Sequence, residues 1–209
     1  MEIILSTILG IASSIIFSFI SNLLSKNKVN KISMQINENV KVSGKSILND
    51  ININRNIELE IICYYIEAYF KKISPENKVF IKVLKCNDEN NAVIVYSNTE
   101  KNDSIQYNLD ENTSMYSVIQ NKDAYINNNI QYFLKHGKPY FEQHKLWADN
   151  YKSIMCFPIR RNEKIIGFLL IGLSNPLNEL IDFENIKEHV EQICNLIGEN
   201  KMFIEAHTQ

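Results

Sequence analysis

The sequence lacks the surplus of basic charge that a general nucleic-acid binder needs. Its 209 residues carry 22 Lys and Arg against 24 Asp and Glu, which gives a formal net charge of −2 at pH 7. Phosphate-backbone binding depends on a basic face, so this balance argues against nucleic acid as a partner. Apolar residues are not scarce, because 45% of the chain is hydrophobic. We therefore expect a folded protein with a sizeable core.

Motifs of metal, nucleotide and hydrolase chemistry are also missing. The sequence has no CxxC pair, no GxSxG, no Walker A loop and no GxGxxG. His136 and His144 have no third ligand at a diagnostic spacing, so solvated loop histidines are the simpler interpretation. We predict no catalytic residue and no metal site, and the pattern identifies no cofactor. The four cysteines are interpreted as buried free thiols: Cys63, Cys86, Cys156 and Cys194.

Charged side chains are absent from residues 3–24, which form the longest apolar stretch of the sequence. A helix of that length spans roughly 33 Å, enough for a hydrocarbon core of about 30 Å. A cleaved signal peptide is the alternative, but it would need a basic start and a small-x-small cleavage site. Glu2 is the only early charge and no such site follows. We expect a retained transmembrane anchor over residues 1–25.

The charges that flank this stretch predict its orientation. Lys26, Lys28 and Lys31 follow it directly, whereas Glu2 precedes it. Lys and Arg favour the cytoplasmic side of a span. We therefore expect a single-pass protein of the cell membrane with a cytoplasmic C-terminal domain, and reduced thiols in that domain.

Small residues recur along one face of the predicted span. Ser6, Gly10, Ser14 and Ser18 are spaced every four residues. Such a small-xxx-small stripe lets two transmembrane helices approach closely, which favours a homodimer. The competing interpretation is that serine is simply frequent in this segment.

Beyond the span the composition changes twice. Residues 26–55 are polar and have no sustained helical period, so they are interpreted as a juxtamembrane connector. Within this connector a loose apolar alternation from Met34 to Val42 permits a short strand or hairpin. Residues 56–209 show the periods of one α+β domain. Asp182 and either Asn112 or Thr113 are candidate helix N-caps. The expected elements, in order, are a helix at 57–73, strands at 79–84, 92–96 and 104–109, a short helix at 112–120, a strand at 124–126, an irregular stretch at 131–151, strands at 153–160 and 165–173, and a closing helix at 182–206.

This order favours an antiparallel central sheet with the two terminal helices on one face, and the last hairpin resembles that of GAF domains. Tyr151–Ile159 ends in a Pro-hydrophobic step, and in Lys164–Ile171 two apolar residues and a glycine follow the lysine. Residues 118–127 and 183–194 are similar to the short helix with its strand and to the closing helix of that family. The resemblance covers roughly residues 56–206. PAS domains share the topology, but the last hairpin is more similar to the GAF pattern.

The resemblance implies a small-molecule or redox sensor, or a regulatory dimerisation module. It places a ligand pocket between the sheet and the loops opposite the terminal helices, here 112–151. Aromatic side chains there are candidate pocket walls or plain packing, and Asp149 is a candidate polar contact or a surface turn residue. The candidate pocket residues are Tyr116, Tyr132, Trp147, Asp149, Tyr151, Cys156 and Phe168.

Three specialised GAF activities lack their residues in this sequence. Asn121-Lys122 begins the cyclic-nucleotide pattern of phosphodiesterases, but the later Phe with Asp-Glu does not follow. No Cys-His pair is present for a bilin, and residues 112–151 contain no cysteine for a methionine-sulfoxide reductase. We therefore expect no enzymatic activity.

Taken together, these features predict a membrane-anchored cytosolic GAF-type sensor that binds an unidentified small molecule. No kinase, cyclase or DNA-binding segment follows the closing helix. We thus expect output through dimer rearrangement or a partner protein. Two alternatives stay open: a ligand-free dimerisation or interaction module, and a ligand-triggered membrane effector of a defence system.

Overall fold

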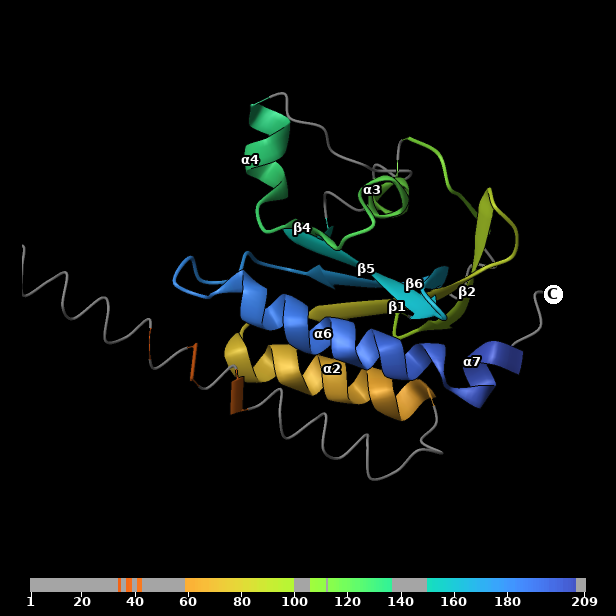
Figure 1. The fold of residues 1–209 in the computed structure, drawn as a ribbon. Helices are drawn as coiled ribbons and strands as arrows, with labels where there is room; N and C mark the ends of the chain where they lie inside the picture. Colours follow the sequence, from red (N-terminus) through yellow and green to blue (C-terminus); the bar gives the residue numbers. More distant parts are fainter. Residues whose placement is uncertain are drawn as a thin grey trace, which may run out of the picture.

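The structure is a computed structural model that describes residues 34, 37–38, 41–42, 59–99, 106–111, 113–136 and 150–205 (Figure 1). The predicted span at 3–24, with Ser6, Gly10, Ser14 and Ser18, lies outside these residues. Among the helices within these ranges, none is long and apolar enough to cross a membrane. The anchor therefore stays a prediction of the sequence.

A six-stranded sheet in the order β3-β2-β1-β6-β5-β4 forms the centre of the domain, and all neighbouring strands run antiparallel. The central pair joins the first strand of the domain to the last, with Lys85 opposite Gly167. Because that pair is antiparallel, the β1–β2 turn and the β5–β6 turn lie at the same end of the sheet. The strands are β1 (Val79–Cys86), β2 (Asn91–Ser97), β3 (Gln106–Asn108), β4 (Tyr125–Asn127), β5 (Ser153–Arg161) and β6 (Lys164–Leu173).

Helices cover both faces of this sheet. Helix α2 (Leu59–Ile73) and helix α6 (Phe183–Gly198) lie side by side on one face, while α3 (Ser114–Asn121) and α4 (Ile130–Lys135) lie on the other (Figure 1). The predicted α+β fold with both terminal helices on one face is therefore confirmed.

Two of the predicted helix caps are also confirmed. The Thr113 hydroxyl accepts a hydrogen bond from the Tyr116 amide, and the Asp182 carboxylate accepts one from the Glu184 amide. Each cap satisfies a backbone N–H that has no partner within its own helix.

The larger core lies between the sheet and the α2–α6 pair. Ile66, Phe70, Ile81, Phe157 and Val190 are all 0% exposed there. On the opposite face the apolar side chains form two smaller clusters, one beneath α3 and one around Ile130, Tyr151 and Ile154. The α2–α6 face therefore contributes most of the hydrophobic stabilisation.

The prediction of one continuous closing helix at 182–206 is wrong. Helix α6 ends at Gly198, and a separate short helix, α7 (Lys201–Glu205), follows. A Cβ at Gly198 would overlap the Arg160 carbonyl, so only glycine lets the end of α6 approach β5 this closely. The Asn200 side chain then caps α7 by accepting a hydrogen bond from the Phe203 amide (3.2 Å). The break turns Phe203 back into the core, where it is 0% exposed.

The prediction of an irregular stretch at 131–151 is wrong at its start, because α4 is helical. The Asn129 side chain accepts a hydrogen bond from the Tyr132 amide (2.9 Å) and so serves as the helix cap. Asparagine is a strong N-cap residue, but its abundance in this sequence hid the signal.

The prediction of a short strand or hairpin in the connector is also wrong. Residues 34, 37–38 and 41–42 are helical. The Asn37 side chain accepts a hydrogen bond from the Asp182 amide (2.8 Å), and the Lys41 carbonyl lies 3.1 Å from His189 Nε2. Both contacts join this helical segment to α6. Packing against α6, rather than a helical period in the sequence, explains why the segment is helical.

Gly172 in β6 offers a test of packing on the α4 side of the sheet. A Cβ at this position would lie 2.8 Å from Cδ1 of Tyr151, and ring atoms of Tyr151 are its three nearest neighbours. We expect Gly172→Ala to lower the free energy of unfolding by about 1–3 kcal/mol. Tyr151→Leu removes the ring, so the double variant should lose less than the sum of the two single losses in denaturant unfolding. Strict additivity would contradict this account.

Candidate functional site

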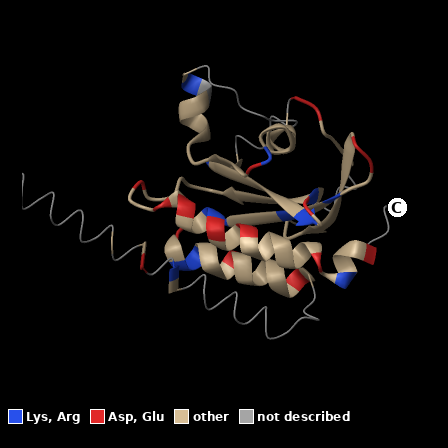
Figure 2. Ribbon diagram, viewed as in Figure 1, with Lys and Arg blue, Asp and Glu red and all other residues tan. Residues whose placement is uncertain are grey.

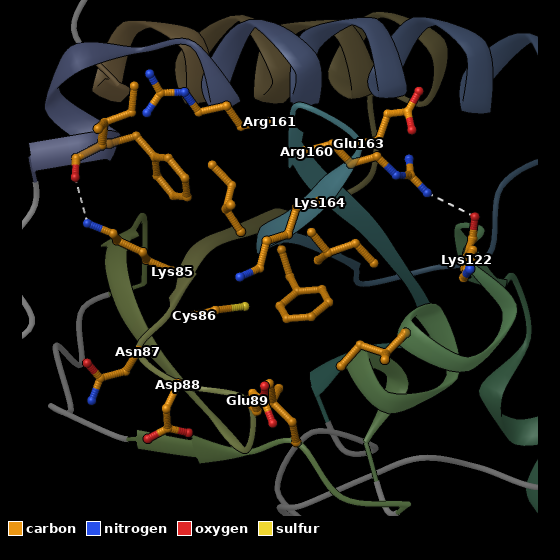
Figure 3. Close-up of a pocket in the computed structure, with 17 residues that line it drawn as sticks. Lys85, Cys86, Asn87, Asp88, Glu89, Lys122, Arg160, Arg161, Glu163 and Lys164 are labelled. Carbon is orange, nitrogen blue, oxygen red and sulfur yellow. Dashed lines mark hydrogen bonds between the residues drawn. The ribbon is translucent and has the colours of Figure 1, made fainter.

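A pocket of about 700 Å³ opens at the end of the sheet where the two hairpin turns meet (Figure 3). The β1–β2 turn, the β5–β6 turn, the C-terminal end of α3 and helix α7 all contribute to its lining. The pairing of β1 with β6 brings these segments together. The site therefore depends on contacts between parts of the chain that are far apart in sequence.

Apolar side chains form the inner wall of this pocket. Leu109, Ile119 and Phe168 come from the α3 side, and Phe203 comes from α7. The register between β5 and β6 shifts after the Ile159–Gly167 pair, which leaves one extra residue in β6. Such a bulge changes the alternation of side chains along a strand. Apolar walls of this kind and size are typical of small-molecule sites.

Five basic and three acidic residues surround the apolar wall. Figure 2 shows Lys and Arg at the β5–β6 end of the sheet, whereas Asp and Glu recur along α6. The Lys85 ammonium donates to the Ile204 carbonyl (2.7 Å) and the Arg160 guanidinium donates to the Lys122 carbonyl (2.9 Å). These two bonds tie α7 and the end of α3 to the strands that line the pocket.

The acidic residues of the pocket are partly engaged by the β1–β2 turn. Asp88 accepts hydrogen bonds from the Asn90 amide (2.7 Å) and the Asn91 side chain (3.1 Å). The bond from Asn91, followed by that from Asn90, lowers the pKa of the Asp88 carboxyl. Its negative charge is thus directed into the turn.

Cys86 is half-buried in the pocket wall, and its environment makes it a poor nucleophile. Burial raises the pKa of its thiol to about 11, and the nearby Lys164 ammonium offsets part of that rise. Burial likewise raises the pKa of the Cys63, Cys156 and Cys194 thiols. None of the four is in a disulfide. The predicted burial is confirmed for Cys63, Cys156 and Cys194, whereas Cys86 is only half-buried.

The Cys86 pKa predicts how this thiol reacts with iodoacetamide. Only the thiolate reacts, so the rate at Cys86 should rise about tenfold per pH unit from pH 8 to pH 10. Lys164→Met removes the charge that favours the thiolate and should slow the reaction at pH 9, whereas Lys164→Arg should not. Mass spectrometry of the modified Cys86 peptide measures both effects. A plateau below pH 9 would contradict the raised pKa.

The structure brings only part of the sequence-predicted pocket together. Phe168 lines the observed pocket, and Cys156 lies fully buried in the same cluster beneath α3. Tyr151 packs edge-on against Phe80 with ring centroids 4.6 Å apart, in the cluster beneath α4. Tyr116 is half-buried on α3.

A further candidate, Tyr132, is not among the described residues that line this pocket. Tyr132 on α4 is 45% exposed and stacks on His136 at 4.0 Å between ring centroids. Trp147 and Asp149 lie outside the described residues, as does His144. Their role in a pocket stays a prediction.

Sequence reasoning missed the basic residues that surround the pocket. Lys85, Lys122 and Lys164 each lie next to a predicted turn or helix end, where a solvated charge is the ordinary interpretation. The available signal was the pairing of the first and last hairpins, which places both turns at one end of an antiparallel sheet. Within the described ranges, no group of three His, Cys, Asp or Glu side chains is placed to hold a metal ion.

Comparison with known proteins identifies the architecture. Neither a protein-family model nor a curated protein matches the chain. Among solved structures, one described as the structure of the GAF domain matches with a TM-score of 0.57 at 16% identity, over 79% of this chain and 90% of that one. The chain has the GAF fold. The GAF-like fold expected from the resemblance of its last hairpin is thereby confirmed.

Other structures with this fold serve different roles. The GAF domain of a two-component sensor histidine kinase from Bacillus halodurans matches with a TM-score of 0.51 at 15% identity, over 73% of this chain and 99% of that one. The fRMsr of Staphylococcus aureus in its reduced form matches with a TM-score of 0.50 at 16% identity, over 77% and 94% of the two chains. The fold alone therefore does not fix the activity, which must be argued from the site.

Proposed function

We propose that the chain is a membrane-anchored GAF-type sensor whose domain binds a small molecule in the pocket at the hairpin end of the sheet. The observation that carries this proposal is the pocket itself, which combines an apolar wall with a polar, charged opening on a GAF fold. Residues 3–24 supply the anchor, and rearrangement of a dimer or contact with a partner protein supplies the output.

One observation favours a second candidate, a ligand-free interaction module. Phe168, Cys156 and Met115, between α3 and the sheet, are at most 2% exposed, so they fill much of the space where the GAF resemblance implied a ligand. Tyr132, by contrast, is 45% exposed on α4 and stacks on His136. The hairpin-end pocket is what keeps the sensor ahead of this alternative.

A thiol-dependent enzyme is disfavoured by the state of the cysteines. Burial raises the pKa of the Cys156 and Cys194 thiols, and Cys86 has no second cysteine beside it in the pocket lining. Thiol chemistry needs an accessible thiolate, which these surroundings oppose. The absence of enzymatic activity nevertheless stays a prediction.

Thermal unfolding of the full chain in nanodiscs, screened against nucleotides and metabolites, tests the sensor. A ligand at 100-fold excess over its Kd stabilises the folded state by about 2.7 kcal/mol. Ile119→Trp places a large ring into the pocket wall and should abolish the shift, while Glu188→Ala on the outer face of α6 should preserve it. A broad library without a single pocket-dependent shift would favour the interaction module.

The predicted dimer can be tested through the stripe at Ser6, Gly10, Ser14 and Ser18. Gly10 would lie where two helices approach most closely, so Gly10→Ile should weaken association several-fold in a membrane two-hybrid assay. Residues 1–31 alone should be used, because the cytosolic helices could dimerise independently. Ile11→Leu lies on another face and serves as the control. Equal association of wild-type and Gly10→Ile segments would leave the span a monomeric tether.

A further inference from the structure

The pocket at the hairpin end contains cations that the described part of the protein does not neutralise. The described residues form three ion pairs, and all three lie outside the pocket lining: Lys71–Glu67, Lys187–Asp123 and Lys201–Glu205. Lys122, Arg161 and Lys164 therefore form no ion pair with a carboxylate of the described residues. In Figure 3 the Lys164 side chain extends into the pocket toward Cys86. Charged groups beside an apolar wall, without a protein partner, are suited to a ligand of opposite charge.

We propose that this pocket takes a small organic anion, with a carboxylate or phosphate group facing Lys164 and an apolar body against Ile119 and Ile165. The inference rests on the proposed sensor function and names its ligand class. The basic side chains outnumber the acidic ones by five to three, and one of the three, Asp88, is held by its own turn. The remaining acids, Glu89 and Glu163, are exposed residues of the two turns. Lys122, Arg161 and Lys164 are also exposed, so within the described lining three free basic groups face two free acidic ones.

The arrangement of the pocket suits an anion that is partly apolar rather than a bare inorganic ion. Ile119 and Ile165 in the lining are half-buried and keep apolar surface open to water above the buried Phe168, so a fully hydrated ion would leave this surface uncovered. A ligand that covers it gains hydrophobic stabilisation, while its charged group stays near the open, basic side. The apolar wall and the basic side together favour one amphiphilic molecule.

Cys86 allows the sign of the electrostatic potential in the pocket to be measured in the full chain. Two methanethiosulfonate reagents, one with a sulfonate and one with a trimethylammonium group, are allowed to react with Cys86 in nanodiscs. The rate with the anionic reagent is divided by the rate with the cationic reagent, and this ratio is then divided by the same ratio measured for free 2-mercaptoethanol. The normalised ratio should exceed one. Lys164→Met should lower it about five-fold, and Lys164→Arg should preserve it. A change in the thiol pKa affects both reagents alike and cancels in this ratio.

Protection of Cys86 from iodoacetamide then tests the ligand class with matched probes. Phenyl phosphate or benzoate should slow the reaction at lower concentration than benzamide, which has the same ring without the charge. The two anions distinguish a phosphate site from a carboxylate site. Equal protection by benzamide would overturn the anion proposal while leaving a ligand pocket, and hence the sensor, in place. A normalised rate ratio of one or less, or no protection by either anion, would also overturn it.

Discussion

Gly167→Val is expected to cost the domain about 3 kcal/mol or more of unfolding free energy, because no side chain fits at this position. Gly167 lies in β6, at the centre of the sheet, opposite Lys85 on one side and Ile159 on the other. A Cβ there would overlap the Leu84 carbonyl and would lie 2.7 Å from the Phe203 ring. The Phe203 ring could move, but the Leu84 carbonyl belongs to a paired central strand and could not.

The expected readout is a fall of about 10 °C in the melting temperature of the full chain, since each kcal/mol shifts a domain of this size by a few degrees. Ile166→Val is the matched control, because it changes the neighbouring residue by one methylene and should cost no more than about 1.5 kcal/mol. Displacement of Phe203 by the new side chain would also disturb α7, and with it the Lys85–Ile204 bond at the pocket. A Gly167→Val protein with the same melting temperature as the wild type would refute the assigned packing.

Most of the regular elements could be predicted because their signals are local. The apolar period of α2, the alternation of β1 and β2 and the Asp182 cap all lie within a few residues of the elements that they define. The break between α6 and α7 has a distant cause, the carbonyl of Arg160 beside Gly198. A sequence shows a glycine near the end of a helix but not the strand that approaches it.

The candidate site was harder to predict than the fold for the same reason. Phe168 was identified as a pocket residue from the GAF resemblance, and it does line the observed pocket. Lys85, Lys122 and Lys164 acquire their meaning only when two hairpin turns and a helix end meet in space. In isolation each is an ordinary exposed lysine, for which surface solvation is the correct default.

A double substitution in the predicted span, Ile11→Asp with Ile15→Asp, is expected to move the protein from the membrane fraction to the soluble fraction. Residues 3–24 carry no charge in the wild type, and both positions lie near the middle of that stretch. A carboxylate at the centre of a transmembrane helix costs about 2.5–3.5 kcal/mol of insertion free energy. Two such groups outweigh much of what the surrounding isoleucines contribute, so the helix should no longer insert.

Carbonate extraction of membranes, followed by detection of the domain in pellet and supernatant, measures this change. Ile11→Leu with Ile15→Leu keeps the span apolar and should remain in the pellet. The variant domain should also keep its melting temperature, because both positions precede the predicted start of the domain at residue 56. If the aspartate variant stays in the carbonate-resistant pellet, or if the wild type is already soluble, residues 3–24 do not anchor the protein and the sensor acts without a membrane.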